Sequence, residues 1–336
     1  MLEILLLDRL VPEALAWLGE RHQVAYRPDL ADDPAALRRE LYNVQSVVLP
    51  RRVQVTREFL DFAPVLRGIA RMQGSAESTD LEACRERRVR VIQANSAQVR
   101  ATAEFLLASL MLLYRRGIAG AVKGDRTASH GLGRELHGSV VGILGLAPAA
   151  HALALMLDAL GARLIGYDPA VHPTASTWQR LRIQPVSLND LLSRADAVTA
   201  QVLYAKRYEH FINAKALAHC KPGQVWVATT RSALFEPDAL ATAMADGRID
   251  AAILDGADPA FAGRGTSLYE HPNLYLTPRL RGATREARAR GSWYVAQRLH
   301  ETLTQPRQSG FEALMTGPMG LDSVLPESAP VPLSDS

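Results

Sequence analysis

Cysteine is scarce in this sequence. Only two cysteines, Cys84 and Cys220, occur among the 336 residues. Two cysteines cannot form a disulfide framework or a multi-cysteine metal site. The nine histidines are scattered and lack the spacing of metal ligands. We therefore expect a protein of a reducing, cytoplasmic compartment that binds no metal ion.

Long uninterrupted apolar runs are also missing. Each apolar stretch is broken by a charged residue, a glycine or a proline well before the ~18 residues that a membrane-spanning helix needs. The first apolar stretch already contains Asp8, Arg9 and Glu13, which is unlike a secretory signal. The sequence therefore predicts neither a secretory signal nor a membrane span or membrane partner.

Charge of one sign is only slightly in excess. Lysine and arginine number 38 and aspartate and glutamate 35, which gives a net charge of +3. This excess is too small to predict a nucleic-acid partner. Apolar residues make up 48% and charged residues 22% of the chain, as in ordinary globular proteins. The length favours two domains.

What the sequence does contain is a regular alternation of short apolar segments with helical patterns. The apolar segments, each expected to be a strand, are Leu2–Asp8, Val24–Tyr26, Ser46–Leu49, Gly68–Met72, Val89–Ile92, Val140–Leu146, Arg163–Tyr167, Val198–Val202, Val225–Thr229, Ala251–Leu254 and Leu274–Thr277. This alternation predicts an α/β fold with two doubly wound parallel sheets. The segments Thr102–Arg116 and Thr284–Thr304 predict two long helices.

A glycine turn follows the strand that begins at Val140. Gly145-Leu146-Ala147-Pro148 occupies the place of a dinucleotide-binding G-x-G-x-x-G loop, but only its first glycine is present. Ala147 adds a Cβ where a phosphate should approach, and Pro148 removes a backbone N–H from the helix N-terminus. The alternative is an ordinary strand–helix turn with proline at the first helical position.

An acidic residue stands at the distance that this motif requires. Asp168 ends the next strand, 23 residues after Gly145. An acidic residue at roughly 20 residues binds the ribose hydroxyls of NAD in dinucleotide-binding folds. No arginine follows Asp168 directly, so NAD is favoured over NADP. The alternative is that Asp168 caps the turn before Pro169.

Further motifs follow one another in a set order, and together they make the sequence resemble the D-isomer-specific 2-hydroxyacid dehydrogenases. The resemblance extends over residues 1–305. The motifs are Asp80-Leu81-Glu82-Ala83, Ala103-Glu104, Gly133-Arg134-Glu135-Leu136-His137-Gly138, Lys221-Pro222-Gly223, Val227-Ala228-Thr229-Thr230-Arg231, Gly247-Arg248-Ile249, Ala251-Ala252-Ile253-Leu254-Asp255, Leu276-Thr277-Pro278 and Gly282-Ala283-Thr284.

The resemblance implies an organisation and an activity. It implies a flavodoxin-like substrate domain made of residues 1–100 and 290–318, a Rossmann NAD-binding domain at 101–289, and an active site in the cleft. The proline- and serine-rich end, 319–336, is expected to be a tail. Hydride transfer between NAD(H) and a small 2-hydroxy or 2-oxo acid is the implied reaction, and a homodimer through the Rossmann domain is the implied assembly.

Several residues match family positions of known role. Arg231 takes the place of the arginine that binds the substrate carboxylate, and its planar guanidinium suits bidentate pairing with a carboxylate. Asp255 takes the place of the aspartate that faces the nicotinamide carboxamide. The expected cofactor-binding residues are Gly145, Leu146, Ala147, Pro148, Asp168, Thr230 and Asp255.

Other positions depart from the family pattern. The acid/base histidine is replaced by Arg279, which stays protonated and cannot cycle a proton. The glutamate that tunes this histidine falls at Asp258, so Arg231, Asp258 and Arg279 form the expected catalytic set. Gly74 and Ser75, in the loop that holds the substrate carboxylate, are the other expected substrate-binding residues. The family's His-x-Pro reads Gln201-Val202-Leu203, and Tyr204 just beyond it is a candidate acid by position.

Two interpretations of Arg279 remain open. In the first, Arg231 and Arg279, with Arg281 as an optional third arginine, converge on one cleft and favour a dianionic acid. In the second, Arg279 pairs with Asp258 in place of a histidine–glutamate pair. Three functions therefore stay in view. The first is an NAD-dependent dehydrogenase of a small anionic substrate. The second is an inactive family member that binds a ligand or a protein, and the third is a non-redox enzyme acting on an anion.

Overall fold

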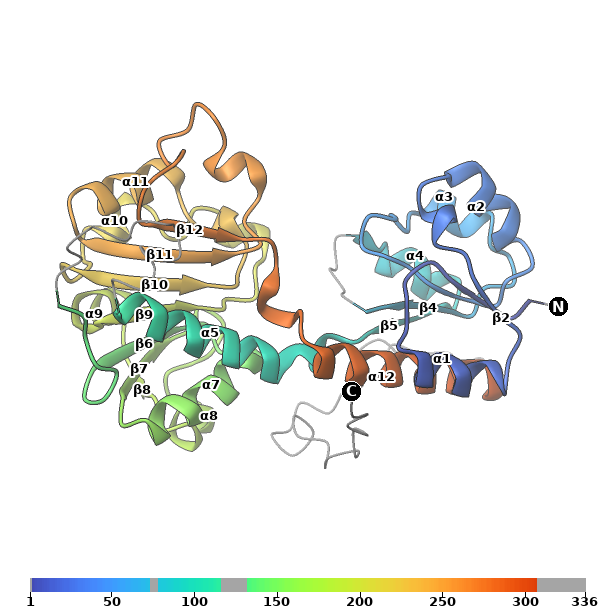
Figure 1. Ribbon diagram of the computed structural model, residues 1–336, viewed down its shortest axis with the longest axis horizontal. Helices are drawn as coiled ribbons and strands as arrows, with labels where there is room; N and C mark the ends of the chain where they lie inside the picture. Colours follow the sequence, from blue (N-terminus) through green and yellow to red (C-terminus); the bar gives the residue numbers. More distant parts are fainter. Residues whose placement is uncertain (1, 73–77, 116–131, 307–336) are drawn as a thin grey trace, which may run out of the picture. The chain divides into compact units, whose positions relative to one another are not determined.

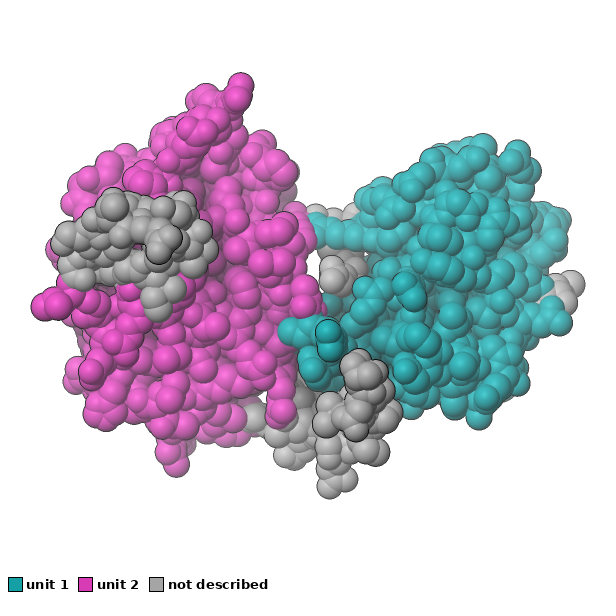
Figure 2. Space-filling model, viewed as in Figure 1, with its two compact units in different colours: residues 1–98, 284–336 teal, residues 99–283 magenta. Residues whose placement is uncertain are grey.

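The chain folds into two α/β units, as the alternation of apolar segments predicts. The computed structural model describes residues 2–72, 78–115 and 132–306. One unit combines Met1–Gln98 with Thr284–Ser336, and the other is Val99–Ala283 (Figure 2). The domain boundaries expected at 100/101 and 289/290 fall inside two helices. The two units instead divide at or next to the first residue of each of these helices. The expected tail, 319–336, lies outside the described residues.

Unit 1, which contains the N-terminus, is built on a five-stranded parallel sheet. The strand order is β2-β1-β3-β4-β5, the order of flavodoxin-like folds. The strands are β1 (Ile4–Leu6), β2 (Val24–Tyr26), β3 (Ser46–Val48), β4 (Gly68–Arg71) and β5 (Arg90–Gln93).

Helices cover both faces of this sheet (Figure 1). One face packs on α2 (Pro34–Leu41), α3 (Arg57–Asp61) and α4 (Leu81–Glu86), and the other on α1 (Pro12–Gly19) and α12 (Arg285–Thr304). Alternate residues of each strand enter the two cores. Leu5 faces α2, whereas its neighbours Ile4 and Leu6 face α1 and α12. This double burial explains why the strands read as unbroken apolar runs.

Unit 2 is built on a seven-stranded parallel sheet. Its strand order, β12-β11-β10-β9-β6-β7-β8, contains the 3-2-1-4-5-6 order of a dinucleotide-binding fold. The strands are β6 (Val140–Leu144), β7 (Arg163–Tyr167), β8 (Gln184–Pro185), β9 (Ala197–Ala200), β10 (Gln224–Ala228), β11 (Ile249–Asp255) and β12 (Leu274–Thr277).

The helices of unit 2 also lie on both faces of its sheet (Figure 1). The pair α5 (Val99–Tyr114) and α7 (Pro148–Ala159) pack on each other, and α5 contacts β10 and β11. The opposite face buries α9 (Leu188–Arg194), α10 (Ala214–Leu217) and α11 (Pro237–Ala245), while the short α8 (Ser176–Arg180) packs beside β8. The Trp226 ring of β10 is the largest fully buried side chain of the described residues and anchors this core.

Local signals in the sequence explain where several helices begin. The side chains of Asp80, Ser187 and Thr284 each accept a hydrogen bond from a backbone N–H in the first turn of α4, α9 and α12. Proline at the first helical position starts α1, α7 and α11. Among these starts, that of α7 follows the glycine turn of the candidate site.

The two cysteines lie buried, one in each unit, and are expected to be unreactive. Burial raises the pKa of the Cys84 thiol to about 11 and that of the Cys220 thiol to about 12. Because the thiolate is the reactive form, we expect Ellman's reagent to label the native protein at pH 8 on the order of 10²-fold more slowly than free cysteine.

The same shifts predict how stability depends on pH. A thiol whose pKa is raised by folding leaves stability unaffected below about pH 8.5 and lowers it as pH rises toward about 11, because the unfolded thiol ionises first. Urea midpoints should therefore fall between these values. The Cys84→Ala and Cys220→Ala variants show which thiol, and therefore which unit, causes the fall in the urea midpoint. Fast labelling of the native protein by Ellman's reagent at pH 8 would contradict the burial of the thiols.

Candidate functional site

The predicted site residues that belong to unit 2 lie in loops at one edge of its sheet. Strand order reverses between β6 and β9, which is where ligands bind in open α/β sheets. Asp168 follows β7, Arg231 follows β10, Asp255 ends β11, and Arg279 follows β12. These strands run parallel to one another, so their carboxyl ends meet at the same edge.

The glycine turn after β6 requires its glycine. Gly145 has φ +93°, a left-handed backbone conformation, and its N–H donates to the Tyr167 carbonyl at 2.8 Å. A Cβ at this position would lie 2.5 Å from the backbone nitrogen of Val202. Gly145 therefore lets the end of β6 approach the end of β9, as the first glycine of a dinucleotide loop does.

The start of α7 keeps part of the anion-binding capacity of a helix N-terminus. The Leu146 N–H donates to Asp168 Oδ2 at 2.6 Å, and Pro148 has no N–H to offer. The N–H groups of Ala147 and Ala149 meet no acceptor among the residues that the structure describes. Two donors thus remain at a site where a phosphate group would be favoured.

A histidine in the first turn of α7 adds no positive charge to this site. Burial and, to a smaller extent, the nearby Arg180 lower the pKa of His151. The imidazole is therefore neutral at pH 7. The anion-binding capacity of the turn rests on backbone N–H groups and the helix dipole.

Asp168 is tied to the glycine turn and also borders a pocket. Its Oδ1 accepts from the Ala170 N–H at 2.7 Å, while its Oδ2 accepts from Leu146 N–H. The capping interpretation of Asp168 is therefore correct. Each carboxylate oxygen has a second lone pair, so the cap does not prevent Asp168 from accepting a further hydrogen bond from a ligand.

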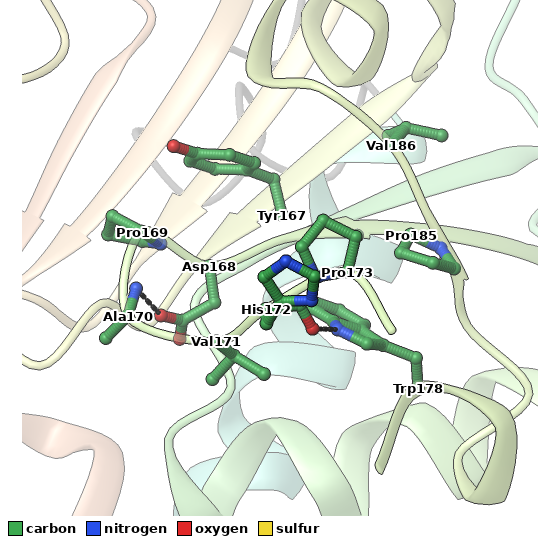
Figure 3. A pocket seen from close by; sticks show the side chains of 11 residues that line it. Tyr167, Asp168, Pro169, Ala170, Val171, His172, Pro173, Trp178, Pro185 and Val186 are labelled. Atoms are coloured by element: carbon green, nitrogen blue, oxygen red, sulfur yellow. Dashed lines mark hydrogen bonds between the residues drawn. The ribbon is translucent and has the colours of Figure 1, made fainter. Parts of the chain in front are cut away.

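The pocket beside Asp168 is a hollow of about 390 Å³. Figure 3 shows the side chains of Tyr167, His172 and Trp178 around it, with the Trp178 Nε1 donating to the His172 carbonyl at 3.0 Å. The remaining lining residues are Gly166, Asp168, Pro169, Ala170, Val171, Pro173, Pro185 and Val186. A largely apolar hollow with one carboxylate at its border fits a flat heteroaromatic base with its ribose on Asp168.

Thr230 and Arg231 follow β10 and are fixed by neighbouring loops. Thr230 Oγ1 donates to the Val202 carbonyl at 2.9 Å, which joins the β10 loop to the β9 loop. Arg231 precedes the short 3₁₀ helix Ser232–Leu234 and is half-buried. Its guanidinium carbon lies 5.6 Å from the centre of the Tyr204 ring. The candidate acid Tyr204 is therefore a neighbour of the predicted carboxylate-binding arginine.

Asp258 has a structural task in its own loop. Its Oδ1 accepts from the Ala260 N–H at 2.9 Å and caps the 3₁₀ helix Pro259–Ala262. Its backbone N–H donates to Ser232 Oγ at 3.1 Å, which ties the β11 loop to the β10 loop. The expectation that Asp258 belongs to the catalytic set stays a prediction.

Asp255 is buried within an ion pair that the sequence did not predict. Its carboxylate is paired with Arg281 Nη1 at 3.0 Å, and the Asp255 side chain is fully buried. Oδ1 accepts from Thr277 Oγ1 and from the Leu280 N–H, both at 2.6 Å. Arg281 was only an optional third member of the expected arginine set, and its guanidinium is paired with Asp255.

Arg279 has an unusual backbone conformation. Its φ and ψ are +58° and +51°, the left-handed region that non-glycine residues rarely adopt. Its side chain lies over Gly256, where a Cβ would come within 2.5 Å of Arg279 Cγ. Arg279 as a whole is exposed, so a ligand in solution can reach it.

Gln201 is the first residue of the segment that replaces the family's His-x-Pro. Its side chain is buried without a hydrogen-bond partner among the described residues. Its side chain is 4% exposed, and neither its Nε2 nor its Oε1 finds a hydrogen-bond partner in the part of the chain that the structure describes. Buried polar groups without partners are rare. The segment after β9 is therefore a place where polar groups of a ligand or a water would be accommodated.

Two of the predicted substrate-binding residues lie outside the described residues, and two findings concern metal sites and membrane helices. Gly74 and Ser75 are not among the described residues. Within residues 2–72, 78–115 and 132–306, no group of three metal-ligating side chains comes together. No helix within these ranges has the length and apolar character to cross a membrane.

Comparison with known proteins gives a family match. Residues 107–280 match the family described as D-isomer specific 2-hydroxyacid dehydrogenase, NAD binding domain. The chain is 28% identical over 306 residues to an (S)-sulfolactate dehydrogenase of Chromohalobacter salexigens, covering 90% of this chain and 99% of that protein. It is 31% identical over 300 residues to a D-3-phosphoglycerate dehydrogenase of Mycobacterium leprae, of which it spans only 55%.

Solved structures show the same fold. The TT0316 protein of Thermus thermophilus superposes with a TM-score of 0.76 at 28% identity, over 90% of this chain and 97% of that one. D-mandelate dehydrogenase of Rhodotorula graminis superposes with a TM-score of 0.73 at 21% identity, over 89% and 94%. The predicted α/β architecture with two parallel-sheet units is confirmed.

Proposed function

The chain belongs to the D-isomer specific 2-hydroxyacid dehydrogenase family, and we propose that it reduces a small 2-oxo acid carrying a second anionic group. Family members are NAD-dependent oxidoreductases that act on CH–OH donors. The observation that carries the proposal is the placement of Arg231 and Arg279 after β10 and β12, at one edge of one sheet. Each guanidinium can pair with one anionic group of the acid.

The cofactor of this reaction is NAD, and the residues of unit 2 fit it. Bound NADH would supply the hydride for C2 of the acid. The hollow beside Tyr167 and Trp178 would hold the adenine, and Asp168 would accept from the ribose hydroxyls. The N–H groups of Ala147 and Ala149, at the start of α7, would donate to the pyrophosphate. Because Asp168 is negative and borders the ribose position, a 2′-phosphate is disfavoured.

The substrate class is supported by the relatives as well as by the two arginines. The sulfolactate and phosphoglycerate dehydrogenases named above act on acids that carry a sulfonate or a phosphate beside the carboxylate. In this chain, Arg231 binds the carboxylate and Arg279 the second anion. Arg281 does not take part, because Asp255 neutralises it.

A proton must reach the carbonyl oxygen when the hydride reaches C2. Arg279 cannot donate and regain a proton at neutral pH. Tyr204, whose ring lies 5.6 Å from the guanidinium of Arg231, carries a transferable proton beside the bound carboxylate. We propose the Tyr204 hydroxyl as the donor, which water then reprotonates.

An NADH titration followed by a substrate panel tests the function. We expect the nucleotide-free protein to bind NADH with micromolar Kd by calorimetry. It should then oxidise NADH in the presence of oxaloacetate at least about tenfold more efficiently than with pyruvate, since about 1.4 kcal/mol from a second ion pair gives tenfold. Equal use of both acids would contradict the dianionic class.

The second function that the structure supports is ligand binding without turnover. The Cβ of Ala147 and the missing N–H of Pro148 weaken pyrophosphate binding, and Arg279 stands where the family carries its proton donor. If the protein binds oxaloacetate but neither binds NADH at millimolar concentration nor oxidises it, this second function replaces the first.

We also propose that the protein is a cytoplasmic homodimer formed through unit 2. The support is a set of exposed apolar side chains on the two helices that pack together, α5 and α7, and at the end of α7, namely Met111, Leu155 and Leu160. Light scattering should give twice the chain mass of 36.6 kDa. A monomer at micromolar concentration would contradict this part of the proposal.

A further inference from the structure

The turn that carries Arg279 is held by a dense set of contacts to one carboxylate. Asp255 Oδ1 accepts from Thr277 Oγ1 and from the Leu280 N–H, each at 2.6 Å. Asp255 Oδ2 accepts from Arg281 Nη1 at 3.0 Å and from the Arg281 N–H at 3.4 Å. Every one of these donors lies within two residues of Arg279. We call Asp255, Thr277 and Arg281 the Asp255 clamp.

The hydrogen bonds of the clamp fill the acceptor sites of the Asp255 carboxylate. An ionised carboxylate has about four acceptor sites. Four donors occupy them here, and Asp255 is 1% exposed. The carboxylate therefore has neither a free lone pair nor an open side for a carboxamide. The family role, in which this aspartate faces the nicotinamide, does not fit the structure of this chain.

The clamp also explains how Arg279 keeps a costly backbone conformation. A non-glycine residue in the left-handed region is strained by the contact of its Cβ with the backbone. Hydrogen bonds to the N–H groups of Leu280 and Arg281, the two residues that follow, hold the turn against relaxation. The Arg279 N–H itself donates to the Thr277 carbonyl at 2.9 Å. The conformation places the stem of Arg279 over Gly256, at the end of β11.

We propose that Asp255 and Arg281 are positioning residues that fix Arg279 for the second anionic group of the substrate. The inference rests on the proposed function, because it assigns Arg279 to that anion. Arg281 thus serves the site without touching the substrate. Its guanidinium pairs with the buried Asp255 carboxylate at 3.0 Å and offsets the cost of burying that group beside the turn.

Limited trypsin digestion tests the clamp without any ligand or activity. Trypsin cleaves after Arg279, and we expect a held turn to resist it. Arg281→Met and Thr277→Val should each raise the cleavage rate at Arg279 by about tenfold or more, since losing about 1.4 kcal/mol from the turn gives tenfold. Cleavage after Arg264, in a neighbouring exposed loop of the same unit, is the internal control and should not change. Unchanged cleavage at Arg279 in both variants would overturn the clamp.

Binding and kinetics then separate the clamp from the family role of Asp255. We expect Asp255→Asn, Thr277→Val and Arg281→Met to raise the KM for oxaloacetate about tenfold, a difference of about 1.4 kcal/mol. The KM for pyruvate and the Kd for NADH should stay within about twofold (~0.4 kcal/mol) of the parent values. A rise in the NADH Kd for Asp255→Asn alone would instead support a nicotinamide contact and overturn the proposal.

The outcomes also distinguish failure of the clamp from failure of the proposed function. If the parent protein neither binds NADH nor turns over any acid, the proposed function fails, and the digestion still decides the clamp. If Asp255→Asn does not fold because Arg281 is left unpaired, the double variant Asp255→Asn/Arg281→Met removes both charges and should fold. That double variant should also be cleaved rapidly at Arg279, and resistance would count against the clamp.

Discussion

Replacing Arg231 by methionine is expected to remove most of the reductase activity while leaving NADH binding intact. Arg231 is half-buried after β10 and is the residue assigned to the substrate carboxylate. Losing one partner of a desolvated, hydrogen-bonded charge pair costs about 2–5 kcal/mol, roughly a 30- to 4,000-fold loss in kcat/KM. Steady-state rates with oxaloacetate at saturating NADH measure this loss, and calorimetry measures the NADH Kd.

Two further variants show whether the loss comes from the planar fork of Arg231. Arg231→Lys keeps the charge but cannot pair in a bidentate way, so it should recover only part of the activity. Arg264→Met removes an exposed arginine from a loop of the same unit and should change nothing. An NADH Kd that rises in parallel with the loss of activity would show that Arg231 serves the cofactor and not the acid.

Replacing Gly145 by alanine is expected to destabilise unit 2 and abolish NADH binding. The new Cβ would lie 2.5 Å from the Val202 nitrogen and 2.6 Å from its Cα, both of them backbone atoms that cannot rotate away. The left-handed φ of +93° adds strain for any side chain. Together, overpacking and this backbone cost give about 2–5 kcal/mol. Urea unfolding measures the stability, and calorimetry measures the NADH Kd.

Gly247→Ala is the matched control for this experiment. Gly247 also lies in unit 2 and has φ +77°, but apart from Gly247 and its two chain neighbours no heavy atom of the described residues lies within 4 Å of the position that its Cβ would take. We therefore expect only the conformational cost of about 1–2 kcal/mol and an unchanged NADH Kd. Equal destabilisation in both variants would mean that the approach of β6 to β9 plays no part in stability.

The cofactor half of the site was largely predictable because it depends on local sequence. Gly145 follows a strand and precedes a helix, and Asp168 directly follows the next strand, so chain order alone places both at the same sheet edge. What could not be predicted is that the Asp168 carboxylate binds the Leu146 N–H. That hydrogen bond depends on how closely the two turns approach, which no sequence spacing records.

The substrate half was predicted less well because charges pair across space. Two or three arginines were expected to converge, yet the optional third, Arg281, is neutralised by Asp255, which lies on the neighbouring strand β11. Position along the chain cannot distinguish an arginine that binds a ligand from one that binds a buried aspartate. The apparent surplus of positive charge in the sequence is therefore larger than the charge that the site offers.

The alternation of strands and helices, the two parallel sheets, the family and the chemistry available at each loop can be inferred from the order of residues. These features follow from apolar periodicity and short motifs, which act over a few residues. Which carboxylate is saturated, which arginine is paired and which backbone is held in a left-handed turn depends on the folded arrangement. Those properties depend on the distances between strand ends that are brought together by folding, because hydrogen bonds and ion pairs form only within about 3–4 Å.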